Sequence, residues 1–145
     1  MADTNVGHYL GDLEAATKVI PPNEPYVMMN LITFKPHATY SPGYQGPKPA
    51  TGREAYLIFR DMFNERVREM GLDVSVVFMG KAHTQIVAGP QEGESWDVVA
   101  LAKFSSWAAF RSILEDEKYV KEIQPHRLAA LQEFRSFAVT QPPQS

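Results

Sequence analysis

The feature that most constrains the fold is the order of apolar patterns in the last third of the chain. From Trp96 the sequence reads WDVVALAKFSSWAAFRSILEDEKYVKEIQPHRLAALQEFRSFAVT. An apolar strand is followed by a helix that Ser105 or Ser106 caps, and then by a second helical piece that Pro125 opens. A closing strand comes last. We therefore expect helices to connect the strands of one sheet.

The first two thirds of the chain contain the remaining elements. The clearest helix is expected over residues 52–70, where apolar side chains recur at i, i+3 and i+4, with Gly71 placed to cap its end. Gly80 and Lys81 are spaced as the turn of a hairpin. The expected strands cover residues 26–35, 74–79, 82–88, 96–104 and 134–140.

The order strand, helix, strand, strand, helix, strand is typical of a split βαβ arrangement. In this α+β architecture the helices cover one face of an antiparallel sheet. Both registers of the strand over residues 26–35 are largely apolar, so the second face also needs cover. An isologous homodimer, sheet against sheet, is the expected solution. The alternative is a monomer whose N-terminal segment folds over that face.

Chain length predicts a single domain. The 145 residues, 44% of them hydrophobic, suffice for one ordinary core and are few for two. We place the domain at residues 25–140, after an accessory helix (6–20) and linker within residues 1–24, and before a tail at 141–145. The helix is expected to pack outside the sheet.

Composition excludes several classes of partner. The net charge of −3 gives no basic surface for nucleic acid or an anionic membrane. No apolar run approaches the roughly 18 to 20 residues of a membrane span, and Asp3 stands where a signal peptide carries positive charge. The chain has no cysteine, so disulfides and thiolate sites are excluded. A cytoplasmic protein is expected.

Three segments resemble a known group of proteins. They are NLITFK around Asn30, WDVVALAKF after Trp96, and the helix entry EKYVKEIQPHR. Over residues 25–140 they resemble the ferredoxin-like superfamily that pairs into dimeric α+β barrels, in particular its uncharacterised DUF1330-type branch and fungal polyketide cyclase-like proteins. The resemblance implies a ferredoxin-like fold and a homodimer.

Polar groups that interrupt apolar patterns are the candidates for chemistry, because burying them unpaired is costly. Arg66 lies within the apolar stripe of the helix over residues 52–70. Its guanidinium could hold a carboxylate or enolate of the substrate. Alternatively, its aliphatic stem could cover the core while the guanidinium reaches solvent. On its face of the strand over residues 26–35, Asn30 is the one fully polar side chain. It could contact substrate or make a structural hydrogen bond.

His126 and Arg127 form an adjacent pair in the second helical piece. If that piece is regular, both side chains reach the interior, where His126 could move a proton and Arg127 could hold a developing enolate. Hydrogen bonding to backbone carbonyls is the structural alternative. His83 is a further candidate base, although a solvent-facing strand histidine is the competing interpretation.

The resemblance to polyketide cyclases also implies a tyrosine near the catalytic histidine. Tyr56 and Tyr26 are the tyrosines that could serve. The remaining candidate substrate contacts are aromatic or apolar. The full expected substrate-binding set is Asn30, Tyr26, Tyr56, Phe59, Met28, Trp96 and Trp107. The loop over residues 36–51, rich in proline and glycine, is expected to be a lid or a dimer clasp.

The sequence lacks phosphate-binding, Rossmann, His-Glu-x-x-His and Gly-x-Ser-x-Gly motifs. The histidines at positions 8, 37, 83 and 126 are too scattered to indicate a metal site. We therefore expect no cofactor and no metal, and an apolar small-molecule substrate. The favoured function is a cofactor-free polyketide cyclase acting by enolisation and lactone or pyrone closure. A cofactor-free monooxygenase, for which Asn30, Trp96 and Trp107 supply the residue types, and a non-catalytic binding protein are the alternatives.

Overall fold

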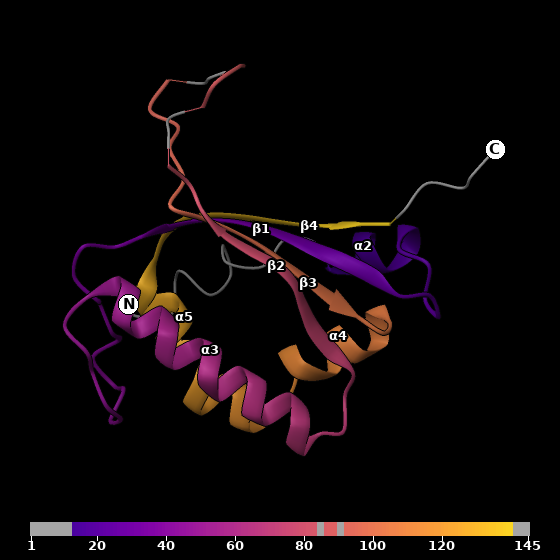
Figure 1. Ribbon diagram of the computed structural model, residues 1–145. Coiled ribbons are helices and arrows are strands. Elements are labelled where there is room, and N and C mark those ends of the chain that lie inside the picture. The colour runs from indigo at the N-terminus through magenta and orange to yellow at the C-terminus, as the bar shows by residue number, and fades with distance from the viewer. Residues whose placement is uncertain (1–12, 84–85, 90–91, 141–145) are drawn as a thin grey trace.

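A computed structural model of the chain describes residues 13–83, 86–89 and 92–140. The chain folds into an antiparallel sheet with helices packed beneath one of its faces (Figure 1). The described elements are α2 (Leu13–Val19), β1 (Tyr26–Phe34), α3 (Gly52–Glu69), β2 (Val74–Lys81), β3 (Val98–Phe104), α4 (Trp107–Leu114), the π-helical turn η1 (Tyr119–Ile123), α5 (Gln124–Ala130) and β4 (Leu131–Val139).

The strand order confirms the ferredoxin-like α+β fold. The strands lie in the order β2, β3, β1, β4, so the two halves of the chain interleave. The central strand β1 pairs antiparallel with β3 and with β4, and Asn30 lies opposite Ala100 on one side and Ser136 on the other. This register places Asn30 at the middle of the sheet.

The expected strand over residues 82–88 is wrong at residues 82, 83 and 86–88, and residues 84–85 lie outside the described residues. β2 continues through Gly80 and Lys81, which pair with Val99 and Val98, so these residues are not a hairpin turn. The Ala82 N–H then donates to the Asp97 carbonyl (2.9 Å), and the connection leaves the sheet. In Figure 1 the described part of this connection projects beyond the ends of β2 and β3.

Helix α3 forms where the sequence predicts it. Thr51 and Glu54 make a capping box at its start, and Gly71, with φ of +69°, follows its last turn. Gly52 is required by close packing, because a Cβ there would lie 2.2 Å from the Lys35 carbonyl oxygen. In the described ranges, neither α3 nor any other helix is long and apolar enough to cross a membrane.

The segment between α4 and β4 departs from a regular helix. Ser106 caps α4 as expected, accepting from the Ala109 N–H at 3.1 Å. After it, η1 is a π-helical turn in which the Gln124 N–H donates to the Tyr119 carbonyl, five residues earlier. A π-turn rotates everything that follows it relative to a 3.6-residue helix. The side-chain directions along α5 therefore differ from those of a regular continuation.

The face of the sheet away from α3, α4 and α5 has no helix on it in the described part of the chain (Figure 1). We call it the open face. Its side chains alternate with those that face the helices, and most are apolar. The apolar members are Val27, Met29, Leu31, Phe78, Val99, Leu101, Phe137 and Val139.

Candidate functional site

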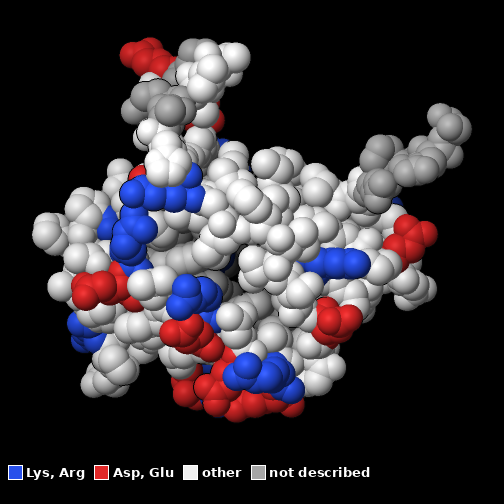
Figure 2. All heavy atoms as spheres, in the orientation of Figure 1, with Lys and Arg blue, Asp and Glu red and all other residues white. Residues whose placement is uncertain are grey.

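A cleft of about 800 Å³ lies between the helix-covered face of the sheet and the helices α2, α3 and α4. We call it the main cleft. Figure 2 shows it as a recess between the sheet and α3, with a mostly uncharged surface around it and Lys and Arg side chains at its rim. Of the expected substrate contacts, the residues that line it are Met28, Asn30, Tyr56, Phe59 and Trp107. Its walls are therefore largely apolar and aromatic.

A fixed amide–hydroxyl pair lies on the floor of the main cleft. The Ser136 hydroxyl donates to Oδ1 of Asn30 at 2.6 Å, across the β1–β4 pairing. The Asn30 Nδ2 lies 3.3 Å from the carbonyl oxygens of Met28 and Ala100. We call Asn30 and Ser136 the polar pair. Ser136 was not predicted as a site residue, although its position opposite Asn30 follows once the β4 register is known.

Arg127 supplies a cation to the same cleft. Its guanidinium carbon lies 5.4 Å from the Phe59 ring centre and 5.5 Å from that of Phe134, a cation–π arrangement on both rings. Arg127 lines the cleft, so the sequence interpretation of an inward-facing arginine agrees with its position. A guanidinium held over aromatic rings can stabilise negative charge that develops on a bound molecule.

One end of the main cleft is closed by α2. The Trp107 Nε1–H donates to Oγ1 of Thr17 at 2.8 Å, and Leu13, Ala16 and Ile20 line the cleft beside it. The helix thus contributes to the cleft wall as well as packing beside the sheet. Tyr26 is different, since its side chain is 2% exposed, stacks on Phe104 and does not line the cleft.

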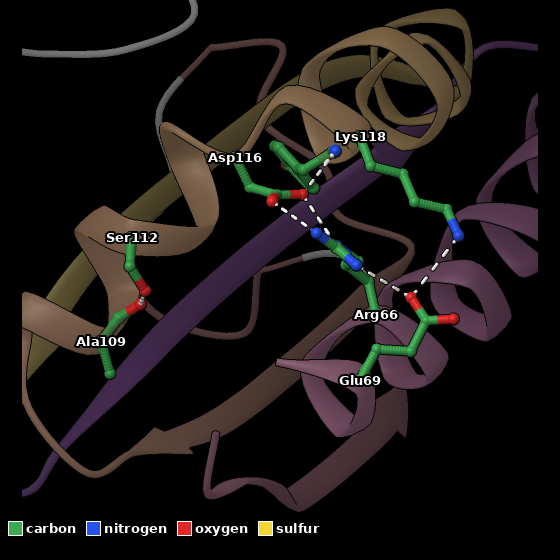
Figure 3. Close-up of polar contacts among 7 residues, drawn as sticks. Arg66, Glu69, Ala109, Ser112, Asp116 and Lys118 are labelled. Carbon is green, nitrogen blue, oxygen red and sulfur yellow. Dashed lines mark hydrogen bonds and ion pairs between the residues drawn. The ribbon is translucent and has the colours of Figure 1, made fainter. Parts of the chain in front are cut away.

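Arg66 is an ion-pairing residue between helices. Its Nε and Nη2 donate to the two carboxylate oxygens of Asp116 at 2.8 and 2.7 Å, and Nη1 donates to Glu69 at 3.0 Å (Figure 3). Asp116 also accepts the Tyr119 N–H at 2.9 Å, and the hydrogen bond from Arg66 holds the Asp116 pKa below its usual value. Arg66 therefore joins α3 to the start of η1 and does not line the main cleft.

His126 lies away from the main cleft, in contact with the loop over residues 36–51. Its side chain is 1% exposed, with Nδ1 at 2.6 Å from the Tyr40 hydroxyl and Nε2 at 2.9 Å from the Tyr44 hydroxyl. In either neutral tautomer, one ring nitrogen donates to a tyrosine and the other accepts from the second tyrosine. The expectation assumed a regular helix, and η1 changes the direction of the side chain.

Burial favours the neutral form of His126. Burial lowers the His126 pKa below its ordinary value. Burial, with a smaller contribution from Tyr44, raises the Tyr40 pKa to about 12. Burial, with a smaller contribution from Glu122, raises the Tyr44 pKa. These aromatic residues were visible in the loop, but no sequence spacing relates them to a histidine more than 80 positions later.

The stability of the fold should depend on pH through His126. The unfolded chain binds a proton at His126 more readily than the folded chain does. The free energy of unfolding should therefore fall as the pH drops from about 6.5 toward the lower folded-state pKa. The decrease should be at most about 1.4 kcal/mol per pH unit. Urea titrations from pH 7.5 to 5 should show a smaller slope for His126→Gln. The matched control, His83→Gln at an exposed position, should keep the wild-type slope. An unchanged slope in His126→Gln would contradict the assignment.

His83 and Trp96 also lie outside the main cleft. His83 is exposed and belongs to the connection after β2 instead of to a strand. The Trp96 Nε1–H donates to Glu94 at 2.9 Å, and the Arg135 guanidinium lies over its ring at 5.8 Å. Among the described residues, no histidine lines the main cleft.

Two solved structures are similar to nearly the whole chain. A crystal structure of the methylated RPA0582 protein superposes with a TM-score of 0.75 at 28% identity, covering 92% of this chain and 93% of that one. A second crystal structure, of RPA0582, a protein of unknown function from Rhodopseudomonas palustris, gives a TM-score of 0.73 at 29% identity, covering 92% and 95%. No protein-family model and no curated protein matches the chain. The similarity confirms the α+β fold.

Proposed function

We propose that the main cleft binds an apolar, carbonyl-bearing substrate and promotes its cyclisation without a cofactor, as polyketide cyclases do. The observation that carries this proposal is the polar pair, Asn30 and Ser136, set in an otherwise apolar floor with Arg127 on the same cleft. A volume of about 800 Å³ is also within the range of small-molecule sites. The apolar walls would pack against the carbon chain of the substrate, and the few polar groups would orient its carbonyls.

In the proposed reaction, a methylene flanked by two carbonyls loses a proton to a base from solvent, and the C–H electron pair becomes an enolate. Arg127 stabilises the negative charge on the enolate oxygen. The Ser136 hydroxyl accepts a hydrogen bond from a second polar group of the substrate. The Asn30 amide orients the same group. The enolate oxygen then attacks an ester carbonyl carbon, a C–O bond forms, and the departing alkoxide or thiolate takes a proton from water.

The position of His126 bears on the choice of base. Since both its nitrogens are engaged by Tyr40 and Tyr44, outside the main cleft, the proposed catalysis rests on positioning and charge stabilisation instead of on a histidine. The substrate's own carbonyls acidify the methylene, which makes this chemistry accessible without an internal base.

Incubation of the purified protein with a poly-β-ketone ester under argon and under air separates the candidate functions. We expect cyclised product in both atmospheres, at rates above the protein-free control. Product that forms only in air would assign a cofactor-free monooxygenase, for which Asn30 and Trp107 line the cleft. Binding of the ketone without product in either atmosphere would assign a carrier and contradict the cyclase proposal.

We also propose that the protein is a homodimer paired through the open face. Met29 lies at the centre of this face, between Leu101 of β3 and Phe137 of β4. Phe137 is 47% exposed and Phe78 is 55% exposed, unusual values for large apolar side chains on a sheet. Of the charged residues of the face, Lys103 and Glu133 are on the outer parts of their strands, whereas Arg135 lies opposite Leu31 with its guanidinium over the Trp96 ring at 5.8 Å. A second copy related by a twofold axis would bury the apolar centre.

A further inference from the structure

A second hollow, of about 690 Å³, lies between the loop over residues 36–51 and the segment formed by η1 and α5. Among the described residues it shares no lining residue with the main cleft. The proposed cyclisation does not use it. Its apolar lining includes Ile58 and Met62 of α3 and Leu128 of α5. A hollow of this size accommodates a small organic molecule.

Gln124 is the unusual polar group of the second hollow. Its side chain is 6% exposed and lines the hollow, and its amide forms no hydrogen bond with any residue that the structure describes. The amide atoms are not among the fully buried side-chain atoms without a partner, so the amide faces the solvent of the hollow. A bound group that hydrogen-bonds to it would take the place of water. A side-chain amide offers a donor and an acceptor in one plane. The Gln124 amide is therefore suited to a bound group that presents the reverse pattern.

The charges around the second hollow favour a neutral ligand. The Lys121 ammonium is paired with Glu117 at 2.6 Å. The Glu122 carboxylate lines the hollow and lies close enough to raise the pKa of Tyr44. His126 lies between its two tyrosines, and burial lowers its pKa, which favours the neutral form. Among the described residues the lining cation is Lys121, which Glu117 already engages, so Glu122 would repel a carboxylate in the hollow more than a neutral amide.

We propose that the second hollow binds small aromatic or apolar molecules that carry a neutral amide or lactam edge, recognised by a two-point hydrogen bond with Gln124. The apolar part of the ligand packs against Ile58, Met62 and Leu128. Tyr44, fixed by His126, forms the wall on the loop side. This site is independent of the proposed cyclisation, and either can fail without the other.

Benzamide and benzoate are a suitable pair of probes, since they share size and ring and differ in the amide. Each is titrated into ¹⁵N-labelled full-length protein at pH 7.5, with the Gln side-chain amide signals followed by NMR. We expect benzamide to shift the Gln124 side-chain amide signals with a roughly millimolar Kd. Benzoate should bind at least about 10-fold more weakly. Absence of benzamide binding, or equal binding of both probes, would overturn the proposal.

Variants locate the binding. Gln124→Leu should weaken benzamide binding by about 10-fold or more, while Gln132→Leu, at an exposed position on the main cleft, should leave it unchanged. If Gln132→Leu weakened binding and Gln124→Leu did not, benzamide would bind in the main cleft, and the proposal would be wrong. Because the Gln124 amide faces the solvent of the hollow and hydrogen-bonds to no described residue, Gln124→Leu should change the Tm by less than about 2 °C. A larger fall in Tm would mean that the amide is a structural group, and Gln124→Met would check that result with a different side-chain shape.

Discussion

Replacing Arg127 by methionine should lower kcat/KM for the cyclisation by about 100- to 1,000-fold while the fold stays intact. This is the usual loss when one donor to a developing oxyanion is removed. Methionine keeps an unbranched apolar stem of about the length of the arginine stem up to Nε, and it removes the guanidinium that lies over Phe59 and Phe134. Steady-state kinetics with the poly-β-ketone ester measure the effect, and circular dichroism reports the fold.

Arg53→Met is the matched control. The Arg53 guanidinium also lies over an aromatic ring, at 4.9 Å from the centre of Phe34, but Arg53 does not line the main cleft. Its loss should leave kcat/KM within about 2-fold of wild type. Equal losses in both variants, or none in Arg127→Met, would show that the cation takes no part in the reaction. The rate should also rise with pH without a step near 6.5, since no histidine in the described part of the chain lines the main cleft.

The strands and the longest helix could be predicted from local pattern, because their apolar side chains repeat with the period of the element that buries them. β1 is apolar on both faces for that reason, and α3 has a capping box at Thr51 and a glycine after its last turn. The expected strand over residues 82–88 is absent from the described part of that range, and the prediction failed because Gly80 and Lys81 look like a turn in isolation. Their pairing with Val99 and Val98 is a tertiary contact.

The candidate site was predictable only in part, because helix phase and loop position decide which polar groups meet. Asn30 and Arg127 line the main cleft, Asn30 from the helix-covered face of β1 and Arg127 from α5. His126 does not, because adjacent residues of α5 point in different directions, and the helix phase after the π-helical turn η1 directs His126 toward Tyr40 and Tyr44. Arg66 was recognised as unusual, yet its partner Asp116 is 50 positions away and no local pattern links the two.

The proposed dimer should dissociate when a charge is placed at the centre of the open face. The wild-type protein should have a mass of about 33 kDa by light scattering, twice the 16.3 kDa of one chain, and Met29→Glu should shift it to the monomer mass at micromolar concentration. In a twofold sheet-to-sheet pairing, this substitution would bury two carboxylates among Leu101 and Phe137 without partners.

Leu57→Glu is the control for that experiment, because Leu57 is an apolar residue of α3 that is 43% exposed and lies away from the sheet. It should remain dimeric. A monomer in which α2 covers the open face does not fit the structure, since Leu13, Ala16 and Ile20 line the cleft on the opposite face. If the wild type is monomeric at tens of micromolar, or if Met29→Glu stays dimeric, the open face does not pair with a second copy. Its apolar side chains would then have to meet a different partner.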